Sequence, residues 1–515
     1  MYGGSGAGKS ASFVIPNALQ LLGSYVFTDP KGELYDKTAG YFKSKGYEIK
    51  VLNLVHPANS DGYNPLHHIN NEIDVDIIAN TIVKGQGEGN KSSDPFWDDM
   101  SEMLMKALIY YLKAVRPPEE QSLASCSELV RTANSSGGDN LLTNLMNQLP
   151  FDHPARMYYK NIEMLPEKTF GSVLGTLQSK LGKFDSREIA EVTSTDTIDF
   201  TEIGKKKTAV FVISSDTHTA YDFLLTIFFS QMIQQLYDFA DISGGELPQP
   251  TYFILDEFAN IGQIPDFDKK ISTSRSRKIS FSVILQNLDQ LEAVYKESYE
   301  TIIGNCDTHL FLGSNSQKTV EYFSKALGEK TITRDNISVN KDKEDWKQGK
   351  SESDQVMGRA LMTPDELRRM DNDICIIYEK GLKPIKANKY YYFKYAEGKL
   401  VTRYKVDHND VHIDRGVWRK YNPYNPYVEG EDDSGSGGNS ASLESLDELF
   451  DDDSDEITVP DQTAEPTAKE AAMPLTPEQE KEEAKRQAEL MDIQKELEAK
   501  FDELFGSIDS DDDTN

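Results

Sequence analysis

The first ten residues of the chain contain the pattern that most constrains its fold. Residues 3–10 match the phosphate-loop pattern G-x-x-x-x-G-K-[S/T] at every position. In such a loop the glycines let backbone N–H groups turn toward a phosphate, Lys9 reaches the β- and γ-phosphates, and the Ser10 hydroxyl can bind Mg2+. We therefore predict that ATP and Mg2+ are bound here. The residues expected to hold the nucleotide are Gly3, Gly4, Ser5, Gly6, Ala7, Gly8, Lys9 and Ser10.

The residues on either side of this loop are unusual. A phosphate loop normally follows a buried strand, whereas only Met1 and Tyr2 precede this one. After the loop, a helix can begin at Ala11 with its positive end facing the phosphate, and Pro16 should bend or shorten that helix. We therefore expect either that the chain has been shortened at its start or that the pattern is a chance glycine-rich turn.

A second motif, far downstream, favours the nucleotide interpretation. Residues 252–257 form an apolar run that ends in Asp256 and Glu257, which is typical of a buried parallel strand with carboxylates at its carboxyl end. Beside a phosphate loop, Asp256 would hold the magnesium shell and Glu257 would polarise the attacking water. The alternative is an ordinary buried strand with a polar end. The nucleotide hypothesis requires Lys9 and Asp256 to converge on one triphosphate.

Two further polar positions fit a nucleotide site. Gln286, at the end of an expected neighbouring strand, can sense the γ-phosphate or orient water. Arg275 and Arg277 lie in a basic stretch that we expect at the same edge of the sheet, where an arginine can stabilise transition-state charge across a subunit boundary. The alternatives are a strand-end cap for Gln286 and a solvated basic patch for the arginines.

The chain alternates between two kinds of pattern. Runs typical of buried strands alternate with helical runs, which predicts a parallel sheet covered on both faces. The expected strands are residues 24–28, 48–52, 208–213, 252–257, 280–285 and 308–312. Between the second and third, residues 69–200 follow helical periodicity and carry no chemical motif. We predict an α/β fold whose nucleotide-binding domain comprises residues 1–68 and 201–428, interrupted by an all-α domain at 69–200.

The negative charge is concentrated in the last part of the chain. The formal net charge is −31, and residues 429–515 contribute −23 of it, with 29 acidic against 6 basic residues. Acid-rich sequence with few aromatic residues is typical of disorder, and we expect at most one helix there, at 477–505. The related motifs at 446–450 and 501–505 could dock a basic protein partner, and a solvating tail is the alternative. DNA is an improbable partner for this segment, since its phosphates would be repelled.

The spacing of the cysteines and the hydropathy of the chain indicate its redox compartment and its relation to a membrane. Cys126, Cys306 and Cys375 lie far apart and form no Cys-x-x-Cys pair, so we expect free thiols in a reducing compartment. We find no secretory signal and no apolar run approaching about 18 residues, so this chain is expected to lack a transmembrane segment of its own.

With these residues assembled, the chain resembles the type IV secretion coupling proteins, the conjugative TraG/TraD-like DNA-transfer ATPases. From the residues alone, 29–33 (Asp-Pro-Lys-Gly-Glu) is best interpreted as a plain turn. Within the resemblance it is the most discriminating stretch, because generic phosphate-loop ATPases lack it. The motifs that carry the resemblance are residues 3–10, 28–35, 63–66, 254–258, Gln286, 358–359 and 363–367.

The resemblance implies a RecA-like motor domain interrupted by an all-α domain, assembled as a homo-hexamer at the cytoplasmic side of the bacterial cell membrane. It implies that Lys9 and Ser10 bind phosphate and magnesium, and that Gln286 is the sensor. Arg275 looks like the arginine that acts on a neighbouring subunit, with Arg277 a close rival. Members of the family carry transmembrane helices and a first core strand ahead of the loop, and we expect this chain to have neither.

The implied function is that of an ATPase that recruits a relaxase bound to single-stranded DNA and drives or licenses its transfer into a type IV secretion channel during conjugation. The implied partners are the relaxase and other relaxosome proteins, single-stranded DNA and the channel subunits. One alternative is a non-hydrolysing docking platform that nucleotide merely organises. Another is a septal-type double-stranded DNA translocase, against which residues 29–33 and the helical insertion argue.

Overall fold

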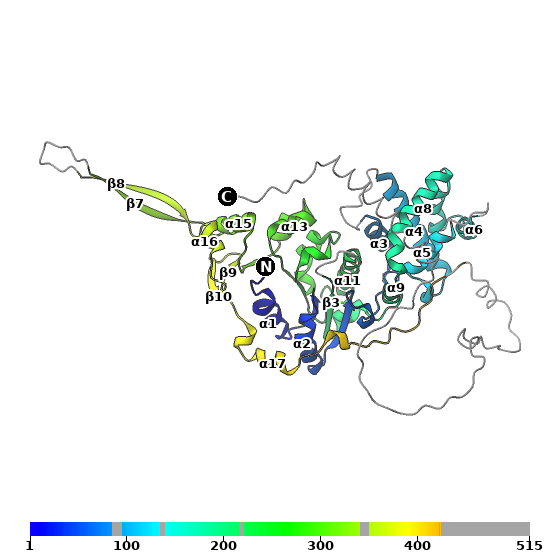
Figure 1. The fold of residues 1–515 in the computed structure, drawn as a ribbon, viewed down its shortest axis with the longest axis horizontal. Coiled ribbons are helices and arrows are strands. Elements are labelled where there is room, and N and C mark those ends of the chain that lie inside the picture. The colour runs from blue at the N-terminus through cyan, green and yellow to red at the C-terminus, as the bar shows by residue number, and fades with distance from the viewer. Residues whose placement is uncertain (85–94, 134–139, 216–220, 340–349, 422, 424–515) are drawn as a thin grey trace, which may run out of the picture. The chain divides into compact units, whose positions relative to one another are not determined.

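The computed structural model describes residues 1–84, 95–133, 140–215, 221–339, 350–421 and 423 (Figure 1). The chain divides into two compact units, Met1–Asp432 and Asp433–Asn515. The second unit lies wholly outside the described residues. The expected helix at 477–505 and the acidic motifs at 446–450 and 501–505 therefore lie outside them too.

The centre of the fold is a five-stranded sheet in the order β2-β3-β1-β4-β5, with every neighbouring pair parallel. The predicted parallel sheet is thus present, but the strand expected at 308–312 is not one of its five strands, because residues 308–311 pair antiparallel with 376–379 in a second sheet. All residues of β1 and β3 are buried, which explains why these strands appear in the sequence as unbroken apolar runs. The strands are β1 (Ser24–Thr28), β2 (Glu48–Asn53), β3 (Thr208–Ile213), β4 (Thr251–Leu255) and β5 (Ile279–Val283).

The two residues before the phosphate loop occupy a strand position of their own. Tyr2 forms parallel bridges with Leu285, just after β5, and with Phe311 of β6. Its N–H donates to the Leu310 carbonyl (2.8 Å), and its carbonyl accepts from the Leu312 N–H (2.8 Å). Tyr2 therefore joins the parallel sheet to a second sheet with the order β10-β9-β6, made of β6 (Thr308–Phe311), β9 (Ile374–Glu379) and β10 (Ile385–Asn388).

Both faces of the parallel sheet are covered, as predicted. Along β1, Tyr25 and Phe27 point into one apolar cluster and Val26 into the other, which is the alternation expected of a strand. The Tyr25 side is covered by α1 (Ile15–Ala18), α2 (Glu33–Ser44) and α17 (Glu397–Arg403). The Val26 side contains α11 (Asp222–Ile242), the helix that the described residues form between β3 and β4.

The chain between β2 and β3 forms helices only, as far as the structure describes it, and they gather beside the sheet (Figure 1). In α4 (Pro95–Val115), the longest of them, an apolar stripe with helical spacing is buried, since Leu104, Leu108 and Leu112 are fully inaccessible. These helices are α3 (Glu72–Lys84), α4 (Pro95–Val115), α5 (Leu123–Thr132), α6 (Leu141–Asn147), α7 (Pro154–Glu163), α8 (Glu167–Leu181), α9 (Arg187–Ser194) and α10 (Phe200–Lys205).

A hairpin and several helices complete the described fold. An antiparallel hairpin, which the sequence analysis did not anticipate, pairs β7 (Glu329–Val339) with β8 (Lys350–Ala360). The remaining helices are α12 (Phe267–Thr273), α13 (Leu288–Tyr295), α14 (Tyr299–Gly304), α15 (Gln317–Leu327) and α16 (Pro364–Arg368).

Residues 404–421, here called the C-terminal strap, connect the sheet domain to the helical insertion. Near its start, the Val406 N–H donates to the Asp36 carbonyl in α2 (2.9 Å). Further on, Arg415 forms an ion pair with Glu191 of α9 (3.0 Å). At its end, the Tyr421 N–H donates to the Ser125 hydroxyl of α5 (3.0 Å). One segment therefore ties α2 to two helices of the insertion.

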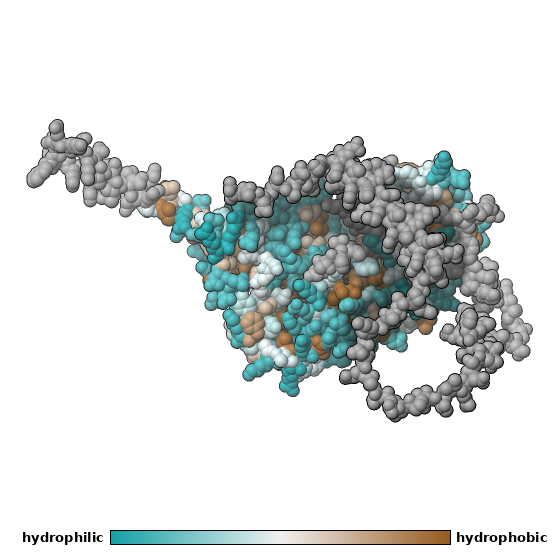
Figure 2. All heavy atoms as spheres, viewed as in Figure 1, coloured by the Kyte–Doolittle hydropathy of each residue, from teal (hydrophilic) through white to brown (hydrophobic). Residues whose placement is uncertain are grey.

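The surface of the described residues is mixed in character. The face drawn in Figure 2 is mainly hydrophilic, with hydrophobic residues scattered over it in small groups. Within the described ranges, no helix has both the length and the apolar character needed to cross a membrane. The three cysteines are free thiols, as expected.

Candidate functional site

The phosphate loop has the backbone of an anion cradle. Gly6 (φ 73°) and Gly8 (φ 78°) adopt the left-handed conformation that favours glycine. The backbone N–H groups of Ser5, Gly6, Gly8 and Lys9 donate to no acceptor among the residues that the structure describes. Unpaired backbone donors gathered in one loop are the groups that bind phosphate oxygens. This donor set fits the phosphates of a nucleotide.

The segment after the loop is helical but short, as Pro16 suggested. Residues Ser10–Val14 form a π-helical turn, in which the Ile15 N–H donates to the Ser10 carbonyl, and α1 then ends at Ala18. Pro16 has no N–H with which to bond the carbonyl of Ser12, so the ordinary α-helical pattern is interrupted at that point.

The acid pair lies directly against the loop. Lys9 Nζ lies 2.5 Å from Glu257 Oε1 and 3.9 Å from Asp256 Oδ1. The Ser10 hydroxyl donates to Asp256 Oδ2 (3.3 Å). Thr28, at the end of the neighbouring strand β1, donates through its hydroxyl to the Asp256 carbonyl (2.6 Å). The structure therefore brings the two motifs, more than 240 residues apart in sequence, to one point at the carboxyl edge of the sheet.

Glu257 is held in a strained conformation. Its backbone is left-handed (φ 50°, ψ 47°), which is uncommon for a residue other than glycine. Its N–H donates to Asp256 Oδ1 (3.0 Å), and Gln286 Nε2 donates to its Oε2 (3.1 Å). Strain of this kind costs on the order of 1–3 kcal/mol and persists where surrounding contacts enforce it. Gln286 thus joins the group formed by Lys9, Asp256 and Glu257.

Burial shapes the electrostatics of the acid pair. It raises the pKa of Asp256, the Lys9 ammonium opposes that shift, and the adjacent Glu257 carboxylate adds to it. A second carboxylate beside a buried one favours protonation, whereas a cation favours the ionised form. A cation that arrives at this pair therefore competes with a proton for Asp256.

The arginines do not lie at the same edge as the acid pair, and that expectation is wrong. β4 and β5 are parallel and in register from Thr251 beside Ile279, so the turn Arg275–Arg277 precedes the amino end of β5. Asp256 follows the opposite end of β4. Residues that precede a strand of a parallel sheet lie at its amino edge, whereas residues that follow one lie at its carboxyl edge.

The two arginines also differ in their surroundings. Arg277 donates to both carboxylate oxygens of Asp241 (2.9 and 3.0 Å) and lies over the ring of Tyr237. Arg275 is exposed, and its side chain contacts no partner among the described residues. Of the two, Arg275 is the one free to reach another molecule.

Asp29, in the discriminating stretch 29–33, organises the start of α2. Its carboxylate is buried and accepts a hydrogen bond from the Tyr35 N–H (2.8 Å), which has no partner within the first helical turn. Burial raises the pKa of Asp29 to about 6, and hydrogen bonds from the Tyr35 and Leu34 N–H groups oppose the shift. The stretch is therefore a helix start at the edge of the site.

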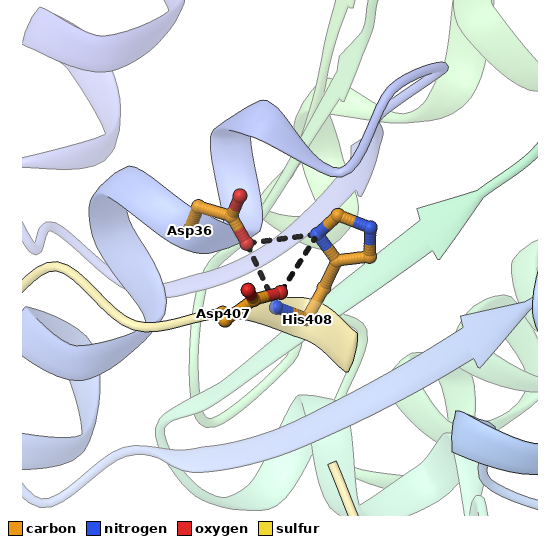
Figure 3. Close-up of side chains that lie close together, drawn as sticks. All are labelled: Asp36, Asp407 and His408. Atoms are coloured by element: carbon orange, nitrogen blue, oxygen red, sulfur yellow. Dashed lines mark hydrogen bonds and ion pairs between the residues drawn. The ribbon is translucent and has the colours of Figure 1, made fainter. Parts of the chain in front are cut away.

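Gly32 is where the C-terminal strap meets α2. Gly32 has φ 72°, and a Cβ there would lie 2.6 Å from His408 Nδ1, so no side chain fits. Figure 3 shows the His408 ring beside the Asp36 and Asp407 carboxylates, and its Nδ1 lies 2.9 Å from Asp36 Oδ1 and 3.9 Å from Asp407 Oδ1. These groups lie close enough to share a metal ion, but their hydrogen bonds already account for the arrangement. We assign no metal to them.

Residues between 372 and 391, which no sequence motif indicated, contact the phosphate loop on the side away from the N–H groups described above. Lys389 Nζ donates to the Ala7 carbonyl (2.8 Å), and the ring of Tyr391 leaves only 3.0 Å for a Cβ on Gly8. Asn372 Nδ2 approaches the Gly6 carbonyl (3.5 Å). A lone lysine after a short strand matches no motif, so no signal in the sequence could have identified it.

The raised pKa of Asp29 predicts a pH-dependent effect of Asp29→Asn. The usual pKa is 3.8 and the folded value is about 6, so the stability that Asp29 contributes is lost as pH rises through this range. Asparagine stays neutral and its oxygen still accepts the Tyr35 N–H. We expect the difference in thermal midpoint, variant minus wild type, to increase as the pH is raised from about 5 to about 7. A constant difference would contradict this account, and Glu297→Gln, at an exposed acid, is the control.

A family model and individual relatives agree on the family to which this chain is similar. A family model described as "Type IV secretory system Conjugative DNA transfer" matches residues 1–413. Protein VirD4 of Rhizobium radiobacter is 24% identical over 399 residues, which cover 75% of this chain and 56% of that protein. Conjugal transfer protein TraG of Escherichia coli is 27% identical over 430 residues, which cover 76% of this chain and 67% of that protein. This chain thus spans little more than half the length of the first relative.

Solved structures agree at the level of the fold. The unbound bacterial conjugative coupling protein TrwBdeltaN70 aligns with a TM-score of 0.55 at 16% identity, over 75% of this chain and 83% of its own. Plasmid coupling protein TrwB in complex with ADP and Mg2+ aligns with a TM-score of 0.56 at 16% identity, over 76% and 84%. The α/β fold with its helical insertion resembles the RecA-like fold of TrwB. The chain belongs to the type IV secretion coupling proteins, the family of conjugative DNA transfer.

Proposed function

We propose that the chain binds ATP and Mg2+ between residues 3–10 and the acid pair, and hydrolyses ATP as the motor of a conjugative coupling protein. The observation that carries this proposal is the meeting of Lys9 and Ser10 with Asp256, Glu257 and Gln286 at one edge of the sheet. The unpaired N–H groups of the loop supply donors for phosphate.

Each residue then has a distinct role. Lys9 exchanges its ion pair with Glu257 for a contact with the β- and γ-phosphates, which frees the Glu257 carboxylate. Glu257 orients the attacking water and takes up its proton. Ser10 and Asp256 hold Mg2+, whose charge offsets that of the phosphates. Gln286, already bonded to Glu257, links that carboxylate to the presence of the γ-phosphate.

Family membership supports the following cellular role. The chain couples ATP turnover to transfer of a relaxase bound to single-stranded DNA into a type IV secretion channel, at the cytoplasmic side of the bacterial cell membrane. Its partners are relaxosome proteins, single-stranded DNA and channel subunits, and its working form is a homo-hexamer. The acidic residues 429–515 serve to dock a basic relaxosome protein.

Arg275 acts on the site of a neighbouring subunit in this hexamer. Within one subunit it lies at the opposite edge of the sheet from Asp256, so it cannot serve its own site. It is exposed and unpaired among the described residues, whereas Arg277 is held by Asp241. Arg275 is therefore the better candidate for a charge that stabilises the transition state in trans.

Two substitutions separate binding from hydrolysis. Lys9→Ala should abolish Mg·ATP binding, because the loop loses its charged phosphate ligand. Glu257→Gln should retain binding and lose at least about 100-fold in turnover, since the amide cannot take up a proton. Titration calorimetry and phosphate release measure the two effects, with the exposed Glu297→Gln as control.

Other outcomes favour the alternative functions. Equal, background-level phosphate release in wild type, Lys9→Ala and Glu257→Gln would exclude the motor and leave a docking platform. Turnover stimulated by double-stranded but not single-stranded DNA would favour a septal-type translocase.

Mixing inactive variants tests the role of Arg275. A ring of Arg275→Ala subunits alone should be inactive, and so should a ring of Glu257→Gln subunits. In mixed rings a Glu257→Gln subunit supplies Arg275 to an intact neighbouring site, so we expect phosphate release to be partly restored. Arg277→Ala in place of Arg275→Ala is the matched control and should stay active unmixed. Failure of every mixture to recover activity would contradict action in trans.

A further inference from the structure

Lys389 is a buried cation directly behind the phosphate loop. It follows β10 and is only 6% exposed. Its Nζ donates to the Ala7 carbonyl (2.8 Å), the Leu312 carbonyl (2.9 Å) and Asn372 Oδ1 (3.2 Å), which uses all three ammonium donors. Burial lowers the pKa of Lys389, which reflects the energetic cost of placing a charge there.

The partners of this ammonium are unusual because all of them are neutral. Among the described residues, no carboxylate lies within ion-pair distance of Lys389. The Asp373 and Asp371 carboxylates oppose the lowering of its pKa, but from beyond that distance. Burial of a charge without a directly paired counter-ion is costly, so the contacts with neutral groups are expected to serve a purpose beyond packing. Two of them hold main-chain carbonyls, one of which belongs to the phosphate loop itself.

The geometry of the peptide group shows what that contact does. The Ala7 carbonyl and the Gly8 N–H belong to the same planar trans peptide and point in opposite directions. Because Lys389 holds the carbonyl, the Gly8 N–H is directed to the other side of the loop. That N–H has no acceptor among the described residues, so it is available to a phosphate oxygen.

Two neighbours restrict the same peptide from behind. The ring of Tyr391 lies against Gly8, where a Cβ would meet it at 3.0 Å. The Tyr391 hydroxyl donates to the Asn372 carbonyl (3.2 Å), and the Asn372 side chain is itself an acceptor for Lys389. Together Asn372, Lys389 and Tyr391 form what we call the loop support.

We propose that Lys389 is a positioning residue of the nucleotide site, which holds the Ala7–Gly8 peptide in the orientation that binds phosphate. This inference rests on the proposed function, because it requires that residues 3–10 bind a nucleotide. Lys389 touches no phosphate and acts only through the loop. Residues more than 380 positions away in the sequence thus preorganise the loop.

Replacement of Lys389 by methionine tests this role. Methionine keeps the length and apolar stem but cannot donate, so the Ala7–Gly8 peptide is free to rotate. We expect Mg·ADP affinity, measured by titration calorimetry on the full chain, to fall by about 10- to 100-fold, the size expected for loss of a hydrogen bond from a charged donor. The matched control is Lys386→Met, an exposed lysine on β10, which should leave the affinity unchanged.

A second readout separates positioning from packing. Amide hydrogen exchange of the peptide that contains residues 3–12 should become faster in Lys389→Met without nucleotide. A lower thermal midpoint with unchanged Mg·ADP affinity and unchanged loop exchange would mean that Lys389 is only structural, and would overturn the inference. If Lys389→Met does not fold, Asn372→Ala removes one acceptor of Lys389 together with the long contact to the Gly6 carbonyl, and should weaken Mg·ADP binding about three- to tenfold. Unchanged binding in that variant would overturn the inference as well.

The result for Lys9→Ala distinguishes this inference from the proposed function. If wild type binds Mg·ADP, Lys9→Ala binds weakly and Lys389→Met binds like wild type, the nucleotide site stands and only the role of Lys389 fails. If wild type itself does not bind Mg·ADP, the proposed function fails and the positioning role fails with it.

Discussion

The site depends on one electrostatic arrangement, the Lys9 ammonium held between the carboxylates of Glu257 and Asp256. It can form only because Tyr2 occupies a strand position between β5 and β6, which places the loop at the carboxyl edge of the sheet beside the end of β4. All three side chains are largely buried, so removal of Lys9 would leave two adjacent carboxylates without a cation. Exchange of the carboxylate for a phosphate preserves the charge balance around Lys9. Lys9 is therefore already held by an anionic group in the position where a phosphate of the proposed nucleotide would replace that group.

Segments from the end of the described chain complete this arrangement. Lys389 holds the back of the loop, and His408 closes over the glycine at the start of α2. The same segment continues as the C-terminal strap to Arg415 and Tyr421, which contact the helical insertion. Residues 389–421 thus contact the loop, α2 and the insertion in turn. One segment of the chain therefore links the back of the loop to the helical insertion through successive contacts.

The sequence was sufficient for the features that follow from local chemistry. Strand and helix periodicity predicted the parallel sheet and the helical insertion, and apolar runs such as Thr208–Ile213 were clear because both faces of the sheet are covered. The meeting of Lys9 with Asp256 was predictable because a phosphate loop and an acidic strand end have one common geometry. The edge at which Arg275 lies follows from strand direction, because residues that precede a strand of a parallel sheet lie at its amino edge, and this is why the expectation that it shares the edge of Asp256 is wrong. The role proposed for Lys389 could not be predicted from the sequence, because it depends only on tertiary contacts.

The most direct test of the account is a structure of the full chain bound to Mg2+ and a non-hydrolysable ATP analogue. We predict phosphates held by residues 3–10, Ser10 and Asp256 beside the metal ion, and Lys9 moved from Glu257 to a phosphate oxygen. A nucleotide bound elsewhere, with the ion pair of Lys9 and Glu257 intact, would contradict the central claim.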